Sequence, residues 1–141
     1  MLPKKMKKIR FDIIIGLYQY DFYQDQYDLY QKKINKNNEV QNHFILKHII
    51  KNICLIDKII NKSLYGYEIN RLNKVDKAIL RLATLELLEQ QNSHKIIINE
   101  AIELSKEYST LNDDKQYKFN NKILHLIYED VQQNKYKTNE F

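Results

Sequence analysis

The feature that most constrains the fold of this chain is its shortage of glycine and proline. Only two glycines and one proline occur among its 141 residues. Sandwiches, barrels and phosphate-binding loops need many tight turns, and those turns depend largely on glycine and proline. A chain of this length buries about two-thirds of its unfolded surface and fits one domain. The sequence therefore predicts an all-α fold in a single domain spanning residues 1–141.

Hydrophobic periodicity divides the chain into five expected helices. Their ranges are Lys7–Phe22, Asn38 to about Ile60 with Gly66 as a C-cap, Lys74 to about Gln90 after an Asn73 cap, Ser93–Tyr108, and Asp113 or Asp114 to about Val131. Between the first two, residues 21–38 are polar and rich in tyrosine, so we expect a loop or a weak short helix there. The polar tail 132–141 is expected to fray.

Two of these helices have sequence features that predict how they pack. Gly16 lies inside the first helix, where glycine costs about 1 kcal/mol relative to alanine, so we expect a neighbouring element to approach closely there. The helix beginning at Lys74 is apolar on more than one side, because Val75 and Ile79 share one stripe while Leu87 extends another. We therefore expect that helix to be central.

Positive charge is concentrated at the beginning of the chain. Lysine and arginine number 23 against 18 aspartates and glutamates, a formal net charge of +5. Five of these cations precede the first acid, Asp12, and they are Lys4, Lys5, Lys7, Lys8 and Arg10. If this segment is helical, it presents a local cationic end. Such an end permits nucleic-acid binding without proving it.

Catalytic, metal and membrane patterns are weak. His43 and His48 are five residues apart, which places them on different faces of a helix rather than as a metal-binding pair. No glycine-rich phosphate loop is present, so we expect no catalytic residues, no metal and no cofactor. The single cysteine, Cys54, has apolar neighbours and is expected to be a buried thiol in the reducing cytosol. No stretch reaches the roughly 20 apolar residues of a membrane span.

Arginine is used at only three positions, so each is a candidate for a planar, forked hydrogen-bond donor. For Arg81 we predict a structural ion pair with Glu100 or Glu103, on the next helix along the chain. Replacement by lysine would then destabilise the protein, because an ammonium group cannot form a bidentate pair.

Two central blocks of sequence resemble the NusB family of transcription antitermination factors. They are Arg71-Leu72-Asn73-Lys74-Val75-Asp76-Lys77-Ala78-Ile79-Leu80-Arg81-Leu82-Ala83 and Ile98-Asn99-Glu100-Ala101-Ile102-Glu103-Leu104-Ser105-Lys106. Arg10 followed by Gly16-Leu17-Tyr18 and the pair Lys118-Phe119 extend the similarity over nearly the whole chain. Ser93 stands where the family usually has proline, and Lys122 replaces a glycine.

The resemblance implies an all-α fold of two small packed helical bundles and a non-enzymatic function. In that family the protein pairs with NusE, a small-subunit ribosomal protein, to hold the boxA element of nascent RNA in the antitermination complex of RNA polymerase. By match to the motif, Lys7, Lys8 and Arg10 are expected at phosphates, and Lys118 with Phe119 beside a base. Lys4 and Lys5 extend the cationic end.

Asp76 and Glu86 lie on the helix with the strongest block and are our candidates for contact with the basic ribosomal partner. Two other functions remain open at this point. One is a helical interaction or homo-oligomerisation module that binds no RNA, and homodimers occur within the family. The other is a small RNA-processing enzyme, which would need convergent ionisable residues that we do not find.

Overall fold

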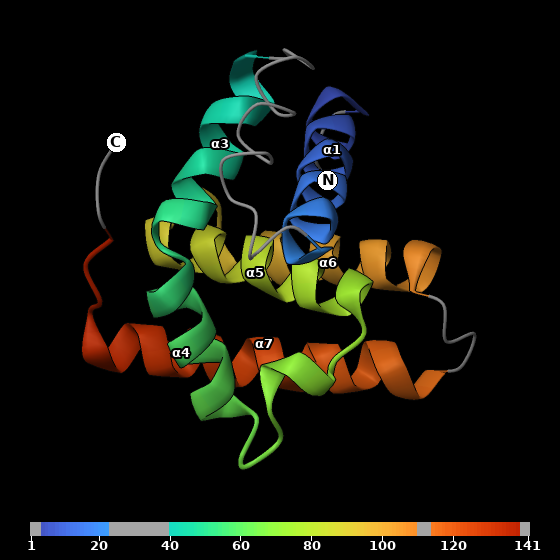
Figure 1. The fold of residues 1–141 in the computed structure, drawn as a ribbon. Helices are drawn as coiled ribbons and strands as arrows, with labels where there is room; N and C mark the ends of the chain where they lie inside the picture. The colour runs from blue at the N-terminus through green and yellow to red at the C-terminus, as the bar shows by residue number, and fades with distance from the viewer. Residues whose placement is uncertain (1–3, 23–39, 110–113, 139–141) are drawn as a thin grey trace.

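The computed structural model describes residues 4–22, 40–109 and 114–138, and every regular element among them is a helix (Figure 1). Its elements are α1 (Lys4–Phe22), α3 (Val40–Lys51), α4 (Ile53–Ser63), the 3-10 turn η2 (Ile69–Arg71), α5 (Lys74–Glu89), α6 (His94–Tyr108) and α7 (Asp114–Asn134). The predicted all-α fold is confirmed. The stretch expected to be a loop or weak helix lies almost entirely outside the described residues.

Helix α5 lies at the centre of the molecule. In Figure 1, α1 and α3 pack above it, α6 lies beside it, and α7 with α4 lies below it; α5 contacts each of these helices. Ile79, Leu80 and Leu87 are each 0–1% exposed. The predicted central position is confirmed, because a helix buried on several sides must be apolar on several sides.

Side-chain caps fix where the two central helices begin. The Asn73 side chain accepts a hydrogen bond from the Asp76 backbone N–H at 2.8 Å, and α5 begins at Lys74. The Ser93 hydroxyl accepts a hydrogen bond from the Ile96 backbone N–H at 3.3 Å, at the start of α6. Both starts agree with the sequence, since Asn and Ser satisfy the N–H groups that a first turn leaves unpaired.

The expected second helix is in fact two helices that meet at Asn52. This residue is buried, and its side-chain amide donates to the His48 carbonyl at 2.9 Å. Its own N–H contacts the carbonyls of both His48 and Ile49. An asparagine that hydrogen-bonds its own backbone competes with regular helix, which accounts for the break that hydrophobic periodicity does not show.

Gly16 is the point of closest approach between α1 and α3. A Cβ atom at this position would lie 2.6 Å from Cδ2 of Leu46 on α3. The expected close approach is confirmed. The loss of helix propensity at this glycine is the cost of letting α3 pack directly on the α1 backbone.

Two local expectations differ from the structure. Cys54 is exposed on α4 rather than buried, because it lies on the outer face of a helix whose inner face is formed by Ile56, Ile59 and Ile60. Helix α7 continues to Asn134, beyond the start of the expected fraying. No described helix is both long enough and apolar enough to cross a bilayer.

Candidate nucleic-acid interface

Three lysines give the first turns of α1 an exposed cationic surface. The side chains of Lys5, Lys7 and Lys8 are exposed, whereas that of Lys4 lies outside the described residues. Lys8 Nζ pairs with Asp12 Oδ2 at 3.3 Å, and the lysine side chain remains 66% exposed. A surface pair of this kind contributes about 0–1 kcal/mol, so a phosphate can replace the carboxylate as its partner.

Arg10 does not belong to this surface. It is 4% exposed, and its guanidinium pairs with the carboxylate of Glu86 on α5. Burial raises the pKa of the Glu86 carboxyl to about 7, Arg10 opposes the shift, and the neighbouring Glu89 and Glu100 add to it. We expected Arg10 at a phosphate and Glu86 at a partner protein. Instead, the two side chains pair with each other between α1 and α5.

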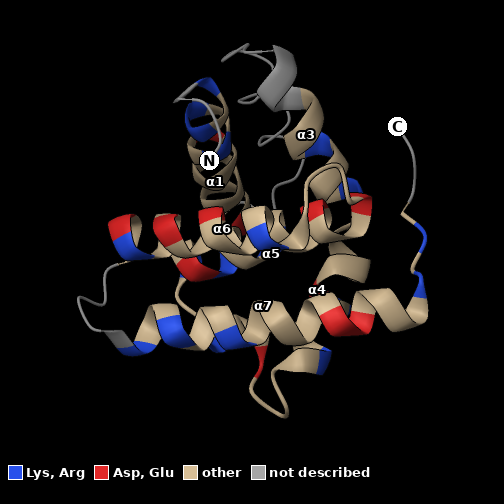
Figure 2. Cartoon of the chain, turned by 180° about the vertical axis from the view of Figure 1, so that it is seen from behind, with Lys and Arg blue, Asp and Glu red and all other residues tan. Residues whose placement is uncertain are grey.

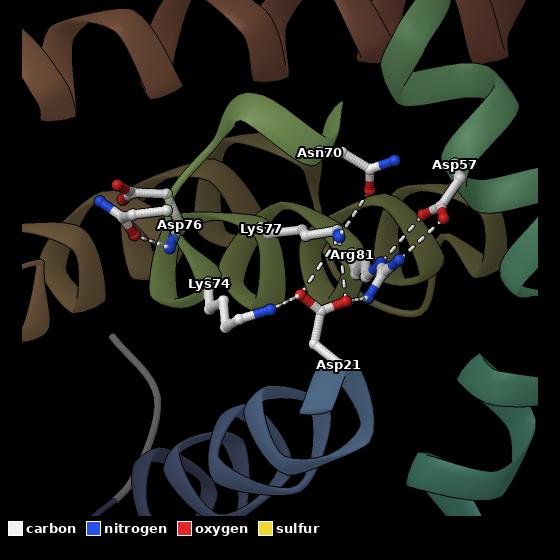
Figure 3. A network of polar contacts seen from close by, with 8 residues as sticks. Asp21, Asp57, Asn70, Lys74, Asp76, Lys77 and Arg81 are labelled. Carbon is white, nitrogen blue, oxygen red and sulfur yellow. Dashed lines mark hydrogen bonds and ion pairs between the residues drawn. The ribbon is translucent and has the colours of Figure 1, made fainter. Parts of the chain in front are cut away.

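The C-terminal end of α1 is tied to α5 by Asp21 (Figure 3). Its carboxylate lies 2.8 Å from Lys74 Nζ, 2.9 Å from Lys77 Nζ and 3.2 Å from Arg81 Nη1. Burial alone would raise the pKa of Asp21, but hydrogen bonds from Lys74 and Lys77 and the charge of Arg81 lower it to about 2. This cluster fixes the direction in which α1 projects its cationic end.

The predicted pairing of Arg81 with Glu100 or Glu103 is wrong. Arg81 forms a bidentate pair with Asp57 of α4, with Nε at 2.9 Å from Oδ1 and Nη2 at 2.8 Å from Oδ2 (Figure 3). The forked donor is used as expected, but α1 and α4 supply its acceptors. Arg81 therefore joins three helices rather than two.

Asp76 does not face a partner protein either. It is fully buried, and its carboxylate accepts hydrogen bonds from Asn120 at 2.8 Å, Ser109 at 3.3 Å and Ser105 at 3.4 Å. These donors come from α7 and from the C-terminal end of α6 and the residue after it. Asp76 thus holds α5, α6 and α7 together near the beginning of α5.

Two contacts of aromatic side chains lie at the C-terminal end of α6, one with α1 and one with α7. The rings of Phe11 and Tyr108 have centroids 4.7 Å apart. Nearby on α6, Lys106 Nζ lies 4.7 Å from the centroid of the Tyr117 ring on α7. We call these four residues the aromatic edge. Its composition suits single-stranded RNA, whose bases stack on aromatic faces while lysines approach the phosphates.

The predicted residues Lys118 and Phe119 lie on different sides of α7. Lys118 is exposed and lines a groove between α6 and α7. Phe119 is half-buried, and its ring centroid lies 6.3 Å from that of Tyr67. Phe119 and Tyr67 line a pocket of about 460 Å³ together with the cations Arg71 and Lys115. Phe119 thus packs against the core and still has a face in an open pocket.

The two predicted basic regions lie on opposite sides of the central helices. Figure 2 shows bands of lysine and arginine at the free end of α1 and on the N-terminal half of α7, with acidic bands on α6 between them. The aromatic edge crosses this separation at the end of α6. A strand that contacts both regions would pass over Tyr108, next to the exposed Glu107 in the last turn of α6.

The described residues contain no cluster of potential metal ligands. No group of three or more potential ligands from His, Cys, Asp and Glu could hold a metal ion in the described ranges. His94 is stacked on Tyr128 with ring centroids 3.9 Å apart, which is a packing contact.

Sequence reasoning missed all four residues of the aromatic edge. Phe11 directly follows Arg10 and reads as part of an apolar helix face. Tyr108 and Tyr117 belong to different helices. Their contacts with Phe11 and Lys106 form only when the folded chain brings these helices together. The available signal was weak: a tyrosine two residues after Lys106 and another immediately before Lys118.

Comparison with known proteins agrees with the fold and the motifs. The model of the NusB family matches residues 5–129. The transcription antitermination protein NusB of Buchnera aphidicola subsp. Cinara cedri is 40% identical over 107 residues, which cover 75% of this chain and 72% of that protein. The NusB of Treponema denticola is 47% identical over 79 residues, covering 55% of this chain and 56% of that protein.

Solved structures give the same result. The NusB of T. maritima superposes with a TM-score of 0.72 at 30% sequence identity, covering 88% of this chain and 90% of that chain. The solution structure of NusB from Aquifex aeolicus has a TM-score of 0.71 at 24% identity, which supports the fold alone. The family match spans most of the chain and includes both central blocks. The chain therefore belongs to the NusB family of non-enzymatic transcription antitermination proteins.

Proposed function

We propose that this protein binds boxA-type single-stranded RNA together with the small ribosomal protein NusE and thereby promotes transcription of ribosomal RNA operons. The observation that supports this most strongly is the set of exposed lysines on α1, α6 and α7 together with the rings at the end of α6, of which Tyr108 is exposed and Phe11 and Tyr117 are half-buried. Membership of the family makes participation in an antitermination complex the expected setting.

The RNA path uses two kinds of contact. Lys5, Lys7 and Lys8 meet phosphates at one end, and Lys106 with Lys118 meets them at the other. Bases stack on exposed faces of the aromatic edge between these ends, where Tyr108 is 37% exposed. Phosphate contacts set register and affinity, whereas the stacked and hydrogen-bonded bases carry the sequence preference.

The number of cations explains why a protein partner is needed. Five lysines on a single strand give a logarithmic salt slope of about −3.5, which corresponds to roughly a hundredfold loss of affinity between 50 and 200 mM salt. The chain alone therefore binds weakly at physiological salt. A ribosomal protein that adds its own contacts restores the affinity.

An exposed apolar stripe on α1 provides a surface for that partner. Ile15 is 41% exposed, Tyr18 is 38% exposed and Phe22 is 59% exposed. Their spacing of three and four residues places them along one side of the helix, next to Phe11 of the aromatic edge. A partner bound there would lie beside the RNA path. This stripe replaces Asp76 and Glu86 as the proposed partner surface.

The test is a titration of boxA-like RNA and scrambled RNA with and without NusE. The variant Lys5→Glu/Lys7→Glu/Lys8→Glu should weaken both RNAs alike, because phosphate contacts carry no sequence information. A matched control reverses three exposed lysines elsewhere, Lys58, Lys135 and Lys137, and should change affinity little. Absence of boxA binding at every salt concentration, even with NusE present, would refute the proposal and favour an interaction module without RNA.

A further inference from the structure

The groove that Lys118 lines, between α6 and α7, lies next to the aromatic edge. It has a volume of about 350 Å³. Its floor is apolar and is formed by Ile98 and Ile102 of α6. Polar side chains line its walls, and they are Lys95, Asn99, Tyr117, Lys118, Asn121 and His125. The groove begins at Tyr117 and Lys118, where the proposed RNA path ends.

Four polar side chains of this groove are unused within the protein. Lys95, Asn99, Lys118 and Asn121 are all exposed, and in the described ranges none of them takes part in a hydrogen bond or an ion pair. Other lysines of the molecule are engaged, as in the pair of Lys62 with Asp130 at 2.7 Å. Four side chains with free donors and acceptors therefore border one groove.

The chemistry of the lining favours a nucleotide. Among the described lining residues there is no carboxylate, whereas two are lysines, so the groove is complementary to a phosphate. The side-chain amides of Asn99 and Asn121 each offer donors and an acceptor, which is what base edges require. Tyr117 and His125 supply flat rings on which a base can stack.

We propose that the groove between α6 and α7 holds an additional nucleotide of the same RNA strand, continuing the path from the aromatic edge. This inference rests on the proposed function. It adds Lys95 as a phosphate contact, Asn99 and Asn121 as contacts to a base edge, and His125 as a stacking surface. The RNA footprint on this protein is then longer than the segment held by α1 and the aromatic edge.

The experiment compares a boxA-like RNA with the same RNA extended by a short uridine tract at its 5′ end or its 3′ end. Fluorescence anisotropy gives the affinity of each RNA for the full chain together with NusE. One extension should improve binding about fivefold, because a stacked base adds stabilisation on this scale. The salt slope should also steepen by about 0.7 for each added phosphate contact.

Variants separate the groove from the rest of the path. Lys95→Glu and Asn121→Asp should abolish the gain from the extension and leave the affinity of the unextended RNA within twofold. Lys58→Glu, at an exposed lysine of α4, is the matched control and should preserve the gain. In parallel, the side-chain amide NMR signals of Asn99 and Asn121 should shift with the extended RNA and stay in place with the shorter one.

Each outcome has a distinct meaning. Equal affinity of the unextended RNA and both extended RNAs would overturn the groove proposal and leave boxA binding intact. A gain that survives Lys95→Glu and Asn121→Asp would place the extra nucleotide elsewhere and would also overturn it. Failure of every RNA to bind would refute the proposed function, and the groove proposal with it.

Discussion

The substitution Asp21→Asn tests how α1 is held on the central helix. The Asp21 side chain is 3% exposed and lies against three cations, Lys74, Lys77 and Arg81. Its pKa is lowered from 3.8 to about 2, which corresponds to about 2.5 kcal/mol of stability at pH 7. Removal of one partner from a buried pair typically costs about 3–5 kcal/mol. We therefore expect a loss of about 3 kcal/mol at neutral pH.

The sign of the pH dependence follows from the direction of the shift. A carboxyl with a lowered pKa contributes its full stability above the unfolded-state pKa and loses it as the pH falls through the folded-state value. For Asp21 this window runs from about pH 4 down to about pH 2. At pH 3 the linkage leaves about 1.3 kcal/mol of the 2.5, so the difference in unfolding free energy between wild type and variant should fall from about 3 to about 1.8 kcal/mol.

Urea denaturation at pH 7 and pH 3 measures the free energy of unfolding of wild type and of Asp21→Asn. Far-UV circular dichroism is the signal, because the chain has no tryptophan for fluorescence. Asp12→Asn is the matched control, because it makes the same change on the same helix at a partly exposed pair. It should cost no more than about 1 kcal/mol. A loss for Asp21→Asn below about 1 kcal/mol, or the same loss at both pH values, would refute the reasoning.

Three further predictions concern the same core. Arg81→Lys should lower the free energy of unfolding by about 1–3 kcal/mol, because lysine cannot keep both hydrogen bonds to Asp57, and an unchanged melting temperature would contradict this. Ile79→Ala should cost about 2–5 kcal/mol in urea denaturation, since Ile79 is 1% exposed in the central helix. For Glu86 the pKa is raised to about 7, so its protonation stabilises the folded state at low pH and that stability is lost as the pH rises from 4.5 through 7. The stability of Glu86→Gln relative to wild type should therefore increase between about pH 5 and pH 8, and a constant difference across that range would count against it.

Local signals in the sequence were sufficient for the helical framework. The starts of α5 and α6 follow from Asn73 and Ser93, whose side chains act within a few residues of their own position. The central position of α5 follows from its apolar faces, and the contact at Gly16 follows from the cost of glycine in a helix. The break at Asn52 was missed because its side chain acts on its own backbone without changing the apolar pattern.

The roles of charged residues were harder to predict, because they depend on partners far away in the sequence. Arg10 pairs with Glu86, which is 76 positions away, so a cation that continues a basic run is removed from the surface. Asp76 resembles a solvated acid in a first turn, yet Asn120 from the last helix covers it. Arg81 was assigned the correct chemistry but the wrong acceptors, since Asp57 belongs to a helix that comes earlier in the chain.

The same limitation applies to the proposed RNA path. The lysines of α1 form a visible run in the sequence, whereas the aromatic edge combines residues of three helices. No single segment contains its pattern. Only the packing of α1 on α5 and of α6 on α7 brings Phe11 to Tyr108 and Lys106 to Tyr117.

Ultraviolet cross-linking of boxA-like RNA to the protein with NusE, followed by mass spectrometry of the peptides, tests the central claim most directly. The proposed path predicts cross-links at Phe11 and Tyr108. Two other aromatic residues are even more exposed but lie off the path, Phe44 at 55% and Tyr65 at 80%, and they should remain unmodified. Cross-links confined to Phe44 and Tyr65 would place the RNA on a different face and contradict the account.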